Sequence, residues 1–520
     1  MKLKEREKNA DSPSIMTRMK TDRKPKMKNN TMPPFGALAL LTVFCLVDGL
    51  PVSASAGNRV PVPIANHTLH MLLGITTDLS DTSDSSETEI ETMESIAEKK
   101  EEMDEALIRV LEAKRWEEEE KFIDDDEKGG QILQEIRSSL FRFVCKICAW
   151  VLYKVFCKLM SKFFANPDQI ALVQQAEKMG IPIVYLPLHR SHLDYLLITW
   201  CNWNFGLRLP HIASRGNLNL GGFGWLLRAT GAFFIRRRVD PSDVGGRDAL
   251  YRVVLHSYIE QLLKISLHIE FLLEGTRSRF GKALVPKHGL ISNVVEAVQP
   301  NIIQDVYLVP VSYTYDNIAE GIFLNELMGI PKTRESFVGV IGEVWKEFRK
   351  SQPCGMVRMH YGRPIRLTEL VPWVEEHETE VSNRALIRAI GYHAVHEAQS
   401  MMSIPSVSIL SALLLNKYRD GAGRETLELD VEWLCERVLE AKREVMGWVS
   451  GVTSGEHLIE YALKFVKDAV KLDDDQIIPI RTRPQLLFLT YKRNALVPVF
   501  GFKAVIGKFQ NFQEFYKGLW

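Results

Sequence analysis

Short apolar runs alternate with stretches of helical periodicity between about residues 168 and 370. This alternation is typical of strands and helices that follow one another in an α/β domain. The predicted strands are 182–187, 211–213, 232–235, 268–273, 305–312 and 356–361. The predicted helices are 168–179, 190–201, 218–228, 246–265, 289–298 and 337–350. We therefore expect an α/β domain over residues 168–370, with a central mixed sheet flanked by helices.

One predicted strand, 305–312, contains Pro310. Proline has no N–H to donate to a sheet ladder, so it is confined to edge strands or to points where a strand is interrupted. An edge position and an interruption beside a functional site are both open for Pro310.

The pattern after residue 370 is helical. Residues 425–442 and 455–471 are predicted to form amphipathic helices, and the acidic Asp473-Asp474-Asp475 follows them. The run 403–415 contains 13 uncharged residues, fewer than the ~20 apolar residues that a membrane-spanning helix needs. We expect this run to dock in protein or at an interface, within a helical C-terminal region over residues 371–520.

A membrane-associating helical region is predicted over residues 131–167. Its segment 139–164 is rich in Phe, Leu, Val and Trp and has no uncharged window longer than seven residues, which does not favour a membrane span. Its basic residues are Arg142, Lys146, Lys154, Lys158 and Lys162. An interfacial helix buries apolar atoms at the headgroup boundary while its lysines stay in water. A helix packed on the next domain is the equal alternative.

Residues 1–130 differ from the rest of the chain. Residues 1–30 hold ten Lys/Arg against four acids, and residues 78–127 hold 21 acids against six Lys/Arg. The acidic stretch is predicted to be a solvated helix or a disordered arm. The uncharged run 35–47 and the small residues Ala54-Ser55-Ala56 fit a signal sequence or weak anchor. A peripheral extension and an artefact of the gene model are the alternatives.

The whole-chain charge is balanced, with 65 Lys+Arg and 65 Asp+Glu. No global field therefore points to nucleic acid, and an anionic ligand must be bound by a local cluster. The seven cysteines are scattered, which gives no disulfide framework and favours a reducing compartment. Cys145 and Cys148 form a Cys-x-x-Cys pair, but no strand precedes it as in a thioredoxin-type motif, so buried or lipid-facing thiols are the better interpretation.

The first predicted strand leads into His189-Arg190-Ser191-His192-Leu193-Asp194. A carboxylate five residues after a histidine can orient the imidazole and stabilise its cationic form, which leaves the other ring nitrogen free as a general base. The pair would then activate a hydroxyl group. A metal site made by His189, His192 and Asp194 and a polar helix cap are the alternatives. A metal site needs a convergent ligand set, and residues 180–370 announce no further ligand.

Basic residues follow two further predicted strands. Arg236-Arg237-Arg238 follow the strand 232–235, and the run Glu274-Gly275-Thr276-Arg277-Ser278-Arg279 follows the strand 268–273. Guanidinium groups match the geometry of phosphate oxygens, and glycine allows a close backbone approach. Ligands of open α/β sheets bind beyond the carboxyl ends of the strands, so we expect these motifs to converge there.

Four ordered motifs resemble those of the glycerolipid acyltransferases. They are His189-x-x-x-x-Asp194, the run from Gly231 to Arg238, the run from Phe271 to Arg279, and Val309-Pro310-Val311. Within that family the chain resembles the mitochondrial glycerol-3-phosphate acyltransferases over about residues 135–475. Family members continue beyond the point that corresponds to Trp520, so we expect the C-terminal region here to be truncated.

The resemblance assigns roles to individual residues. It implies that His189 is the base that deprotonates the acceptor hydroxyl for attack on the acyl-CoA thioester, with Asp194 as its partner. The implied catalytic set is His189, Asp194, Glu274 and Gly275, and the implied acceptor-binding set is Phe234, Arg236, Arg237, Arg277, Arg279 and Pro310. Acyl-CoA is the co-substrate, and the resemblance implies no metal, other cofactor or covalent acyl-enzyme.

The expected activity is acylation of glycerol-3-phosphate at sn-1 to give lysophosphatidic acid, the first step of glycerolipid and triacylglycerol synthesis. Dihydroxyacetone-phosphate acylation in ether-lipid synthesis is the alternative, although the segment 236–252 resembles the former group more closely. An inert membrane-binding scaffold is an alternative from another class. The expected location is the cytosolic side of the mitochondrial outer membrane, with endoplasmic reticulum or peroxisome as alternatives.

Overall fold

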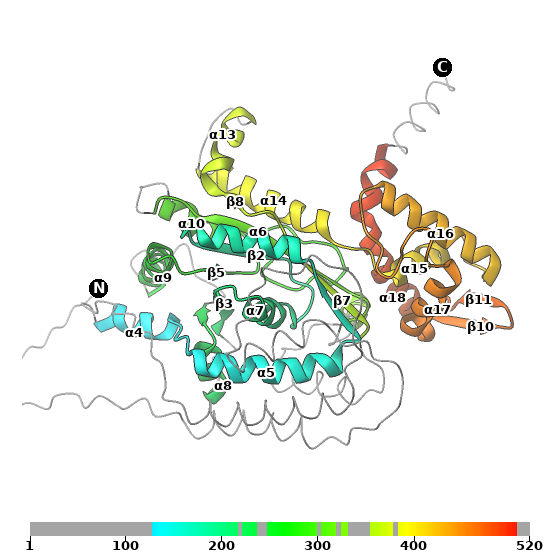
Figure 1. The fold of residues 1–520 in the computed structure, drawn as a ribbon, viewed down its shortest axis with the longest axis horizontal. Coiled ribbons are helices and arrows are strands. Elements are labelled where there is room, and N and C mark those ends of the chain that lie inside the picture. The colour runs from blue at the N-terminus through cyan, green and yellow to red at the C-terminus, as the bar shows by residue number, and fades with distance from the viewer. Residues whose placement is uncertain are drawn as a thin grey trace, which may run out of the picture.

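A computed structural model of the chain describes residues 127–216, 221–236, 247–298, 303–318, 324–330, 354–377 and 383–506. The expectations for the basic leader, the run 35–47, the acidic arm up to residue 126 and the helix 337–350 lie outside these residues, as does Arg237. Figure 1 shows an α/β unit built around a sheet and a helical C-terminal unit beside it.

The sheet of the α/β unit has the strand order β1-β7-β6-β2-β5-β3-β4, and β8 pairs with β6. Its strands are β1 (Lys162–Ala165), β2 (Ile183–Pro187), β3 (His211–Arg215), β4 (Ala232–Ile235), β5 (Ile269–Glu270), β6 (Tyr307–Tyr315), β7 (Met356–Tyr361) and β8 (Ile365–Arg366). The strands from β6 to β4 in this order are parallel, whereas β7 and β8 run antiparallel to β6. The predicted mixed sheet is confirmed, with β2 inside it.

Helices cover both faces of this sheet (Figure 1). α9 (Arg247–Lys264), α10 (Gly289–Val298) and α14 (Asn383–Met401) pack on one face, where α4 (Glu127–Ile136) and α13 (Leu367–His377) extend the layer. α5 (Arg142–Leu159), α6 (Pro167–Lys178) and α7 (Asp194–Asn204) pack on the other face. α8 (Gly221–Ala229) precedes β4, and α11 (Leu324–Leu327) follows β6. The core of the α/β unit thus includes α14, beyond residue 370, and the domain boundary itself stays a prediction.

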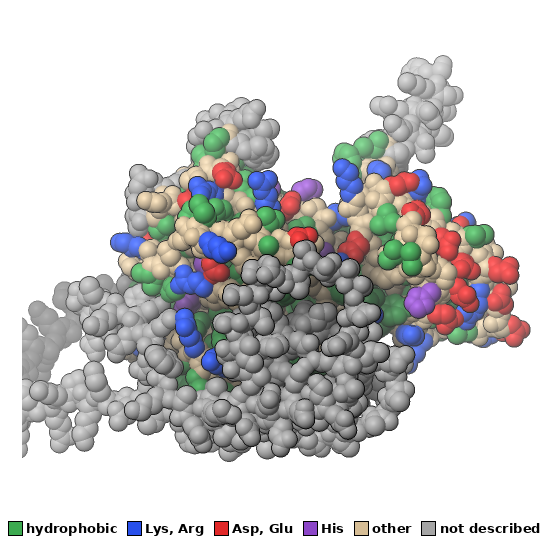
Figure 2. All heavy atoms as spheres, in the orientation of Figure 1, with side chains coloured by type: hydrophobic (Ala, Val, Ile, Leu, Met, Phe, Trp, Pro, Cys, Tyr) green, Lys and Arg blue, Asp and Glu red, His purple; other side chains and the backbone are tan. Residues whose placement is uncertain are grey.

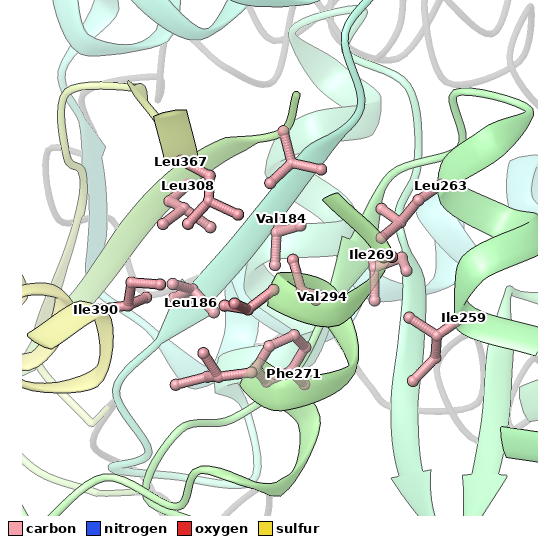
Figure 3. Packing of buried hydrophobic residues seen from close by; sticks show 14 of the residues in the cluster. Val184, Leu186, Ile259, Leu263, Ile269, Phe271, Val294, Leu308, Leu367 and Ile390 are labelled. Carbon is pink, nitrogen blue, oxygen red and sulfur yellow. The ribbon is translucent and has the colours of Figure 1, made fainter. Parts of the chain in front are cut away.

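Strand β2 is apolar on both sides because both faces of the sheet are covered. Val184 and Leu186 lie in the core shared with α10 and α14, as Figure 3 shows, whereas Ile183 and Tyr185 lie in the core shared with α6 and α7. Fully burying one such aliphatic side chain stabilises the fold by about 1.5–3 kcal/mol. The carboxyl end of β2 is therefore held firmly from both sides.

Pro310 lies in an inner strand, so the edge position is wrong for it. β6 has β2 on one side and β7 and β8 on the other. On the antiparallel side, β8 pairs with β6 up to Leu308, and β7 pairs with β6 from Val311 onward. Pro310 lies in the gap between these two ladders. Its carbonyl still accepts the N–H of Gly362 at 2.7 Å. The missing N–H therefore falls where the ladder is interrupted, as the second alternative predicted.

α5 carries the aromatic and basic segment predicted to associate with membranes. The ring of Phe156 meets the ring of Trp200 in α7 edge-on, with centroids 5.5 Å apart, and Trp150 is buried. Lys158 is exposed, and the Lys154 ammonium lies 5.5 Å from the Trp150 ring centroid. The helix packs on the α/β unit, and its contact with a membrane surface stays a prediction. Among the described helices, none is long and apolar enough to cross a bilayer.

The cysteines of α5 form no disulfide. Cys145 is buried, with its Sγ atom 3.8 Å from the carbonyl oxygen of Ala229. Burial raises the pKa of the Cys145 thiol, and redox reactions proceed through the thiolate. The geometry therefore agrees with a buried structural thiol.

The C-terminal unit has its own hydrophobic core. It comprises α15 (Ser406–Asn416), β9 (Ala422–Gly423), α16 (Arg424–Glu440), α17 (Gly455–Val466), a 3-10 turn (Lys467–Ala469), β10 (Val470–Asp473), β11 (Gln476–Pro479), α18 (Arg483–Arg493) and a second 3-10 turn (Asn494–Leu496). α15, which falls in the uncharged run 403–415, is buried among α16, α17 and α18. The run thus docks in protein, one of the two expected placements.

The predicted helix 455–471 is too long. α17 ends at Val466, and the chain enters the hairpin of β10 and β11. Asp473 pairs with Gln476 across the hairpin, and Asp474 at its tip has a φ of 50°, a left-handed conformation that Asp tolerates in turns. Figure 2 shows acidic side chains gathered over this unit. Its exposed acids are Asp420, Glu425, Glu440, Glu456, Glu460, Asp468, Asp473, Asp474 and Asp475.

A buried polar cluster joins the C-terminal unit to the end of β6. Lys492 of α18 donates from Nζ to the carbonyl oxygen of Asp316 at 2.6 Å and to Asn317 Oδ1 at 3.2 Å. The Asp316 carboxylate accepts the N–H of Met356 at 2.7 Å and the hydroxyl of Tyr461. Burial raises the pKa of Asp316 to about 6 and lowers the pKa of Lys492 to about 8. Removing one member would leave the others buried without their partner.

We predict that Lys492→Met lowers the free energy of unfolding by about 1.5–3 kcal/mol, the usual contribution of a hydrogen bond to a charged group. Urea unfolding followed by circular dichroism measures this change. The matched control is Lys467→Met on the exposed surface of the same unit, which should change stability by less than about 0.5 kcal/mol. Equal effects of the two substitutions would contradict the role of the buried cluster of Asp316, Asn317, Tyr461 and Lys492, called here the β6 clamp.

The loss should also depend on pH. Folding raises the Asp316 pKa from 3.8 to about 6, so its contribution is fully present below 3.8 and is lost as the pH rises through 6. Above that pH the carboxylate is charged, and in the variant no ammonium lies near it. The destabilisation by Lys492→Met should therefore be larger at pH 8 than at pH 5.

Candidate active site

The site begins two residues beyond the end of β2. Leu188 continues the strand direction by donating its N–H to Val311 at 2.9 Å, and the turn from His189 to Leu193 follows. α7 starts at Asp194 and not at residue 190 as predicted. The reason is local: the Asp194 carboxylate binds the N–H groups of Arg190 and Ser191, which holds the turn outside the helix.

The Asp194 carboxylate is fully buried and surrounded by donors. Its Oδ2 atom accepts the N–H groups of Arg190 at 2.6 Å and Ser191 at 2.9 Å, and it lies 3.1 Å from Nδ1 of His189. Its Oδ1 atom accepts the hydroxyl of Tyr315 at 2.6 Å. An ionised carboxylate only accepts hydrogen bonds, so this environment suits the charged form.

This contact decides which nitrogen of His189 is available. Because Asp194 can only accept, Nδ1 of His189 is the protonated nitrogen, and Nε2 then carries the lone pair. His189 is 8% exposed, so the imidazole is nearly enclosed. A buried histidine in this tautomer can remove a proton from a hydroxyl group, and the carboxylate behind it stabilises the resulting cation.

Glu274 ties the His189 turn to the segment that follows β5. It is 1% exposed, and its Oε2 atom accepts the N–H of His189 at 2.6 Å while Oε1 accepts the N–H of Leu284. The guanidinium of Arg190 lies 3.6 Å from the same carboxylate. Glu274 thus holds the backbone of the histidine in place, and a direct catalytic role stays a prediction.

Gly275 occupies a position that only glycine fits well. Its φ is +63°, and a β-carbon there would lie 3.2 Å from Cγ of Lys287. Its carbonyl accepts a hydrogen bond from the guanidinium of Arg215, at the end of β3. Arg277 is buried just beyond, and the N–H of Ser278 donates to the His189 carbonyl at 3.3 Å. The third motif therefore wraps around the backbone of the first.

The strand ends lie at one edge of the sheet, but the side chains of the predicted site are spread along that edge. β4 is separated from β2 by β3 and β5, which corresponds to roughly 14 Å at about 4.8 Å per strand. Phe234 is buried in β4 under the guanidinium of Arg228, 4.7 Å from its ring centroid. Arg236 forms an ion pair with Glu135 at 2.8 Å. The structure thus places these two residues apart from the histidine.

The remaining predicted residues lie nearer to β2. Arg279 forms an ion pair with Glu326 of α11 at 2.6 Å. Pro310 is paired with Leu186 across the β2–β6 ladder. The acceptor-binding roles of Phe234, Arg236, Arg277, Arg279 and Pro310 stay predictions, and Arg237 is not among the described residues. Within the described residues, no three His, Cys, Asp or Glu side chains are grouped to hold a metal ion.

Sequence reasoning missed two residues of the site. Tyr315, which binds Asp194, lies beyond the predicted end of the strand at residue 312, although alternate residues from Val311 onward share one face of the strand. Arg215 lies two residues beyond the predicted end of the strand 211–213. In both cases the signal was present, but the predicted strand stopped too early.

Comparisons with known proteins relate the chain to acyltransferases. The Acyltransferase family matches residues 169–314, and the Glycerol-3-phosphate acyltransferase C-terminal region matches residues 323–510. The chain is 53% identical over 415 residues to a probable mitochondrial glycerol-3-phosphate acyltransferase of Caenorhabditis elegans, covering 74% of this chain and 58% of the relative.

Two human relatives are more distant. Mitochondrial glycerol-3-phosphate acyltransferase 1 is 32% identical over 424 residues, which cover 73% of this chain and 50% of the relative. Dihydroxyacetone phosphate acyltransferase is 31% identical over 345 residues, which cover 63% of this chain and 46% of the relative. The chain thus spans about half the length of the relatives it matches. With two adjoining family matches and the ordered motifs in place, the chain contains an Acyltransferase family domain followed by a glycerol-3-phosphate acyltransferase C-terminal region.

Proposed function

We propose that this protein transfers an acyl group from acyl-CoA to the sn-1 hydroxyl of glycerol-3-phosphate, giving lysophosphatidic acid and CoA, the first step of glycerolipid and triacylglycerol synthesis. The contact between His189 Nδ1 and the buried Asp194 carboxylate carries the proposal, because it prepares a base at the end of a central strand. The names of the relatives support the choice of acceptor.

In the proposed reaction, Nε2 of His189 takes the proton of the acceptor hydroxyl as its oxygen attacks the thioester carbonyl carbon. The new C–O bond forms, the C–S bond then breaks, and the proton on His189 passes to the leaving thiolate of CoA. Asp194 stabilises the imidazolium between these steps. A positioned base of this kind contributes about 10²–10⁴-fold to the rate. The proposed route includes neither a metal nor a covalent acyl-enzyme.

The acceptor phosphate would bind among the cations that follow β5 and β3. Arg277 is buried beside the His189 turn, and Lys282, Lys287 and Arg215 are exposed around it. Charge-assisted hydrogen bonds to phosphate contribute about 1.5–3 kcal/mol each. Glycerol without the phosphate should accordingly be a poor acceptor.

Dihydroxyacetone phosphate is the second candidate acceptor, because a relative that is 31% identical carries its name. Both acceptors present the same phosphate, so only the hydroxyl or carbonyl at the central carbon distinguishes them. A site that hydrogen-bonds a hydroxyl rejects a substrate lacking it, because its own polar group is left unpaired. The alternative of an inert scaffold would leave both acceptors unused.

The decisive experiment is acyl transfer by the purified chain from palmitoyl-CoA to three acceptors on one preparation. We predict a higher kcat/KM for glycerol-3-phosphate than for dihydroxyacetone phosphate, and little transfer to glycerol. A higher value for the ketone would assign the chain to ether-lipid synthesis, and no transfer to any acceptor would favour the scaffold.

Substitution of the two histidines of the turn distinguishes a general base from a metal site. His189→Ala should lower kcat by about 10²–10⁴-fold, because the proton acceptor is lost. The matched control is His192→Ala, whose ring lies 6.4 Å from that of His189 in the same turn and which should cost far less. Equal losses in the two variants would favour the metal interpretation, in which both histidines are ligands.

We further propose that the protein acts at a membrane surface, on the cytosolic side of the mitochondrial outer membrane. The names of the relatives support the organelle, and α5 supplies aromatic and basic residues.

We predict that changing Lys154, Lys158 and Lys162 to Glu releases the protein from anionic vesicles, because each Lys near such a surface contributes about 1 kcal/mol. Vesicle sedimentation at low salt measures the bound fraction. The matched control changes the exposed Lys464, Lys467 and Lys471 of the C-terminal unit and should leave binding nearly unchanged. Binding that is indifferent to the first triple change and to salt would contradict an electrostatic contact through α5.

A further inference from the structure

We propose that Tyr315 is a positioning residue of the active site, which holds the Asp194 carboxylate in the orientation that His189 needs. The inference rests on the proposed function of the His189–Asp194 pair. Its basis is the hydrogen bond from the Tyr315 hydroxyl to Oδ1 of Asp194, 2.6 Å long, between residues 121 positions apart in the chain.

The two oxygens of Asp194 are held from different directions. Oδ2 binds three groups of the adjoining turn, the N–H groups of Arg190 and Ser191 and Nδ1 of His189. Oδ1 binds only the Tyr315 hydroxyl among the contacts described here. A carboxylate held at one oxygen can rotate about its Cβ–Cγ bond, and a second contact at the other oxygen fixes the plane. Tyr315 therefore keeps Oδ2 directed at His189.

Tyr315 is itself held rigidly. It is paired with Val357 across the β6–β7 ladder, and its ring stacks on that of Tyr313 with centroids 6.4 Å apart. Its side chain belongs to the core on the α7 face of the sheet. The hydroxyl thus reaches Asp194 from a fixed strand in a site with little water, where a hydrogen bond to a charge is strong.

The next residue connects this position to the C-terminal unit. Asp316 donates its N–H to the carbonyl of Met356 at 3.2 Å, and its own carbonyl and carboxylate are bound by Lys492 and Tyr461. These contacts fix the end of β6 one residue beyond the tyrosine. The C-terminal unit therefore supports the site through Tyr315, although it supplies no atom to the catalytic pair itself.

Tyr313 provides a matched control. It lies two residues earlier in β6, on the same face and fully buried, and its hydroxyl has no hydrogen-bond partner among the residues that the structure describes. Tyr313→Phe and Tyr315→Phe delete the same atom from adjacent sites of one strand. Only the second deletion removes a contact with Asp194.

In the acyl-transfer assay, Tyr315→Phe should lower kcat about tenfold, as expected for a lost hydrogen bond to a charged group. The KM values for both substrates should stay within about twofold. The acid limb of the kcat–pH profile should move to lower pH, since a carboxylate that is no longer held toward Nδ1 stabilises the imidazolium of His189 less. Tyr313→Phe should match the wild type in all three measurements.

Three results would overturn the inference. The first is a Tyr315→Phe protein with wild-type kcat and pH profile, and the second is an equal loss in Tyr313→Phe, which would indicate a packing effect. Thermal unfolding of both variants identifies a loss of folded protein. A raised KM at unchanged kcat would also contradict positioning of the base.

A titration independent of substrate separates this inference from the proposed function. In full-length protein with ¹³C-labelled histidine, the His189 signal is assigned by its absence in His189→Ala. Its titration midpoint should fall in Tyr315→Phe, because a carboxylate no longer held toward Nδ1 stabilises the imidazolium less, and it should stay unchanged in Tyr313→Phe. An unchanged midpoint in Tyr315→Phe overturns the positioning role even if acyl transfer is found. A shifted midpoint in a protein that transfers no acyl group overturns the function alone.

Discussion

The site depends on one buried negative charge, the carboxylate of Asp194. Moving a carboxylate out of water costs several kcal/mol unless hydrogen bonds replace its hydration. Here four donors do so, two from the backbone of the turn, one from His189 and one from Tyr315. Three donors belong to the turn that follows β2 and the fourth belongs to β6. The two strands must therefore be paired before all four donors can meet the charge.

The arrangement of helices on both faces of the sheet follows from the need to hold the donors around this charge. β2 is apolar on both faces, so helices must cover it on both sides, and its carboxyl end is thereby fixed within the unit. The turn that begins at His189 is then held by Glu274, which follows β5, and by Ser278 beyond it. Apolar packing thus fixes the carboxyl-terminal edge of the sheet, and the polar motifs are attached to that edge.

The sequence predicts what is local and misses what depends on register. His189 and Asp194 lie within one turn, so their contact could be inferred from spacing, and the α/β class followed from periodicity. Tyr315 reaches Asp194 only because β6 lies beside β2 and extends to residue 315. The orientation of the Arg236 side chain could not be predicted either, because its ion-pair partner Glu135 lies 101 positions earlier in the chain. The run 268–273 formed only a two-residue strand, because the chain leaves the ladder toward the positive-φ turn at Gly275.

The β6 clamp has a consequence for how the molecule assembles. Asp316 is bound by Tyr461 and Lys492, which lie 145 and 176 positions later in the chain. Contacts of such sequence separation form slowly, because a long loop must close before they are gained. During synthesis the α/β unit is therefore made before the carboxyl-terminal end of β6 gains its contacts with Tyr461 and Lys492. The geometry of the His189–Asp194 pair is completed late, when α18 docks, so the proposed activity should be acquired only after the sheet has formed.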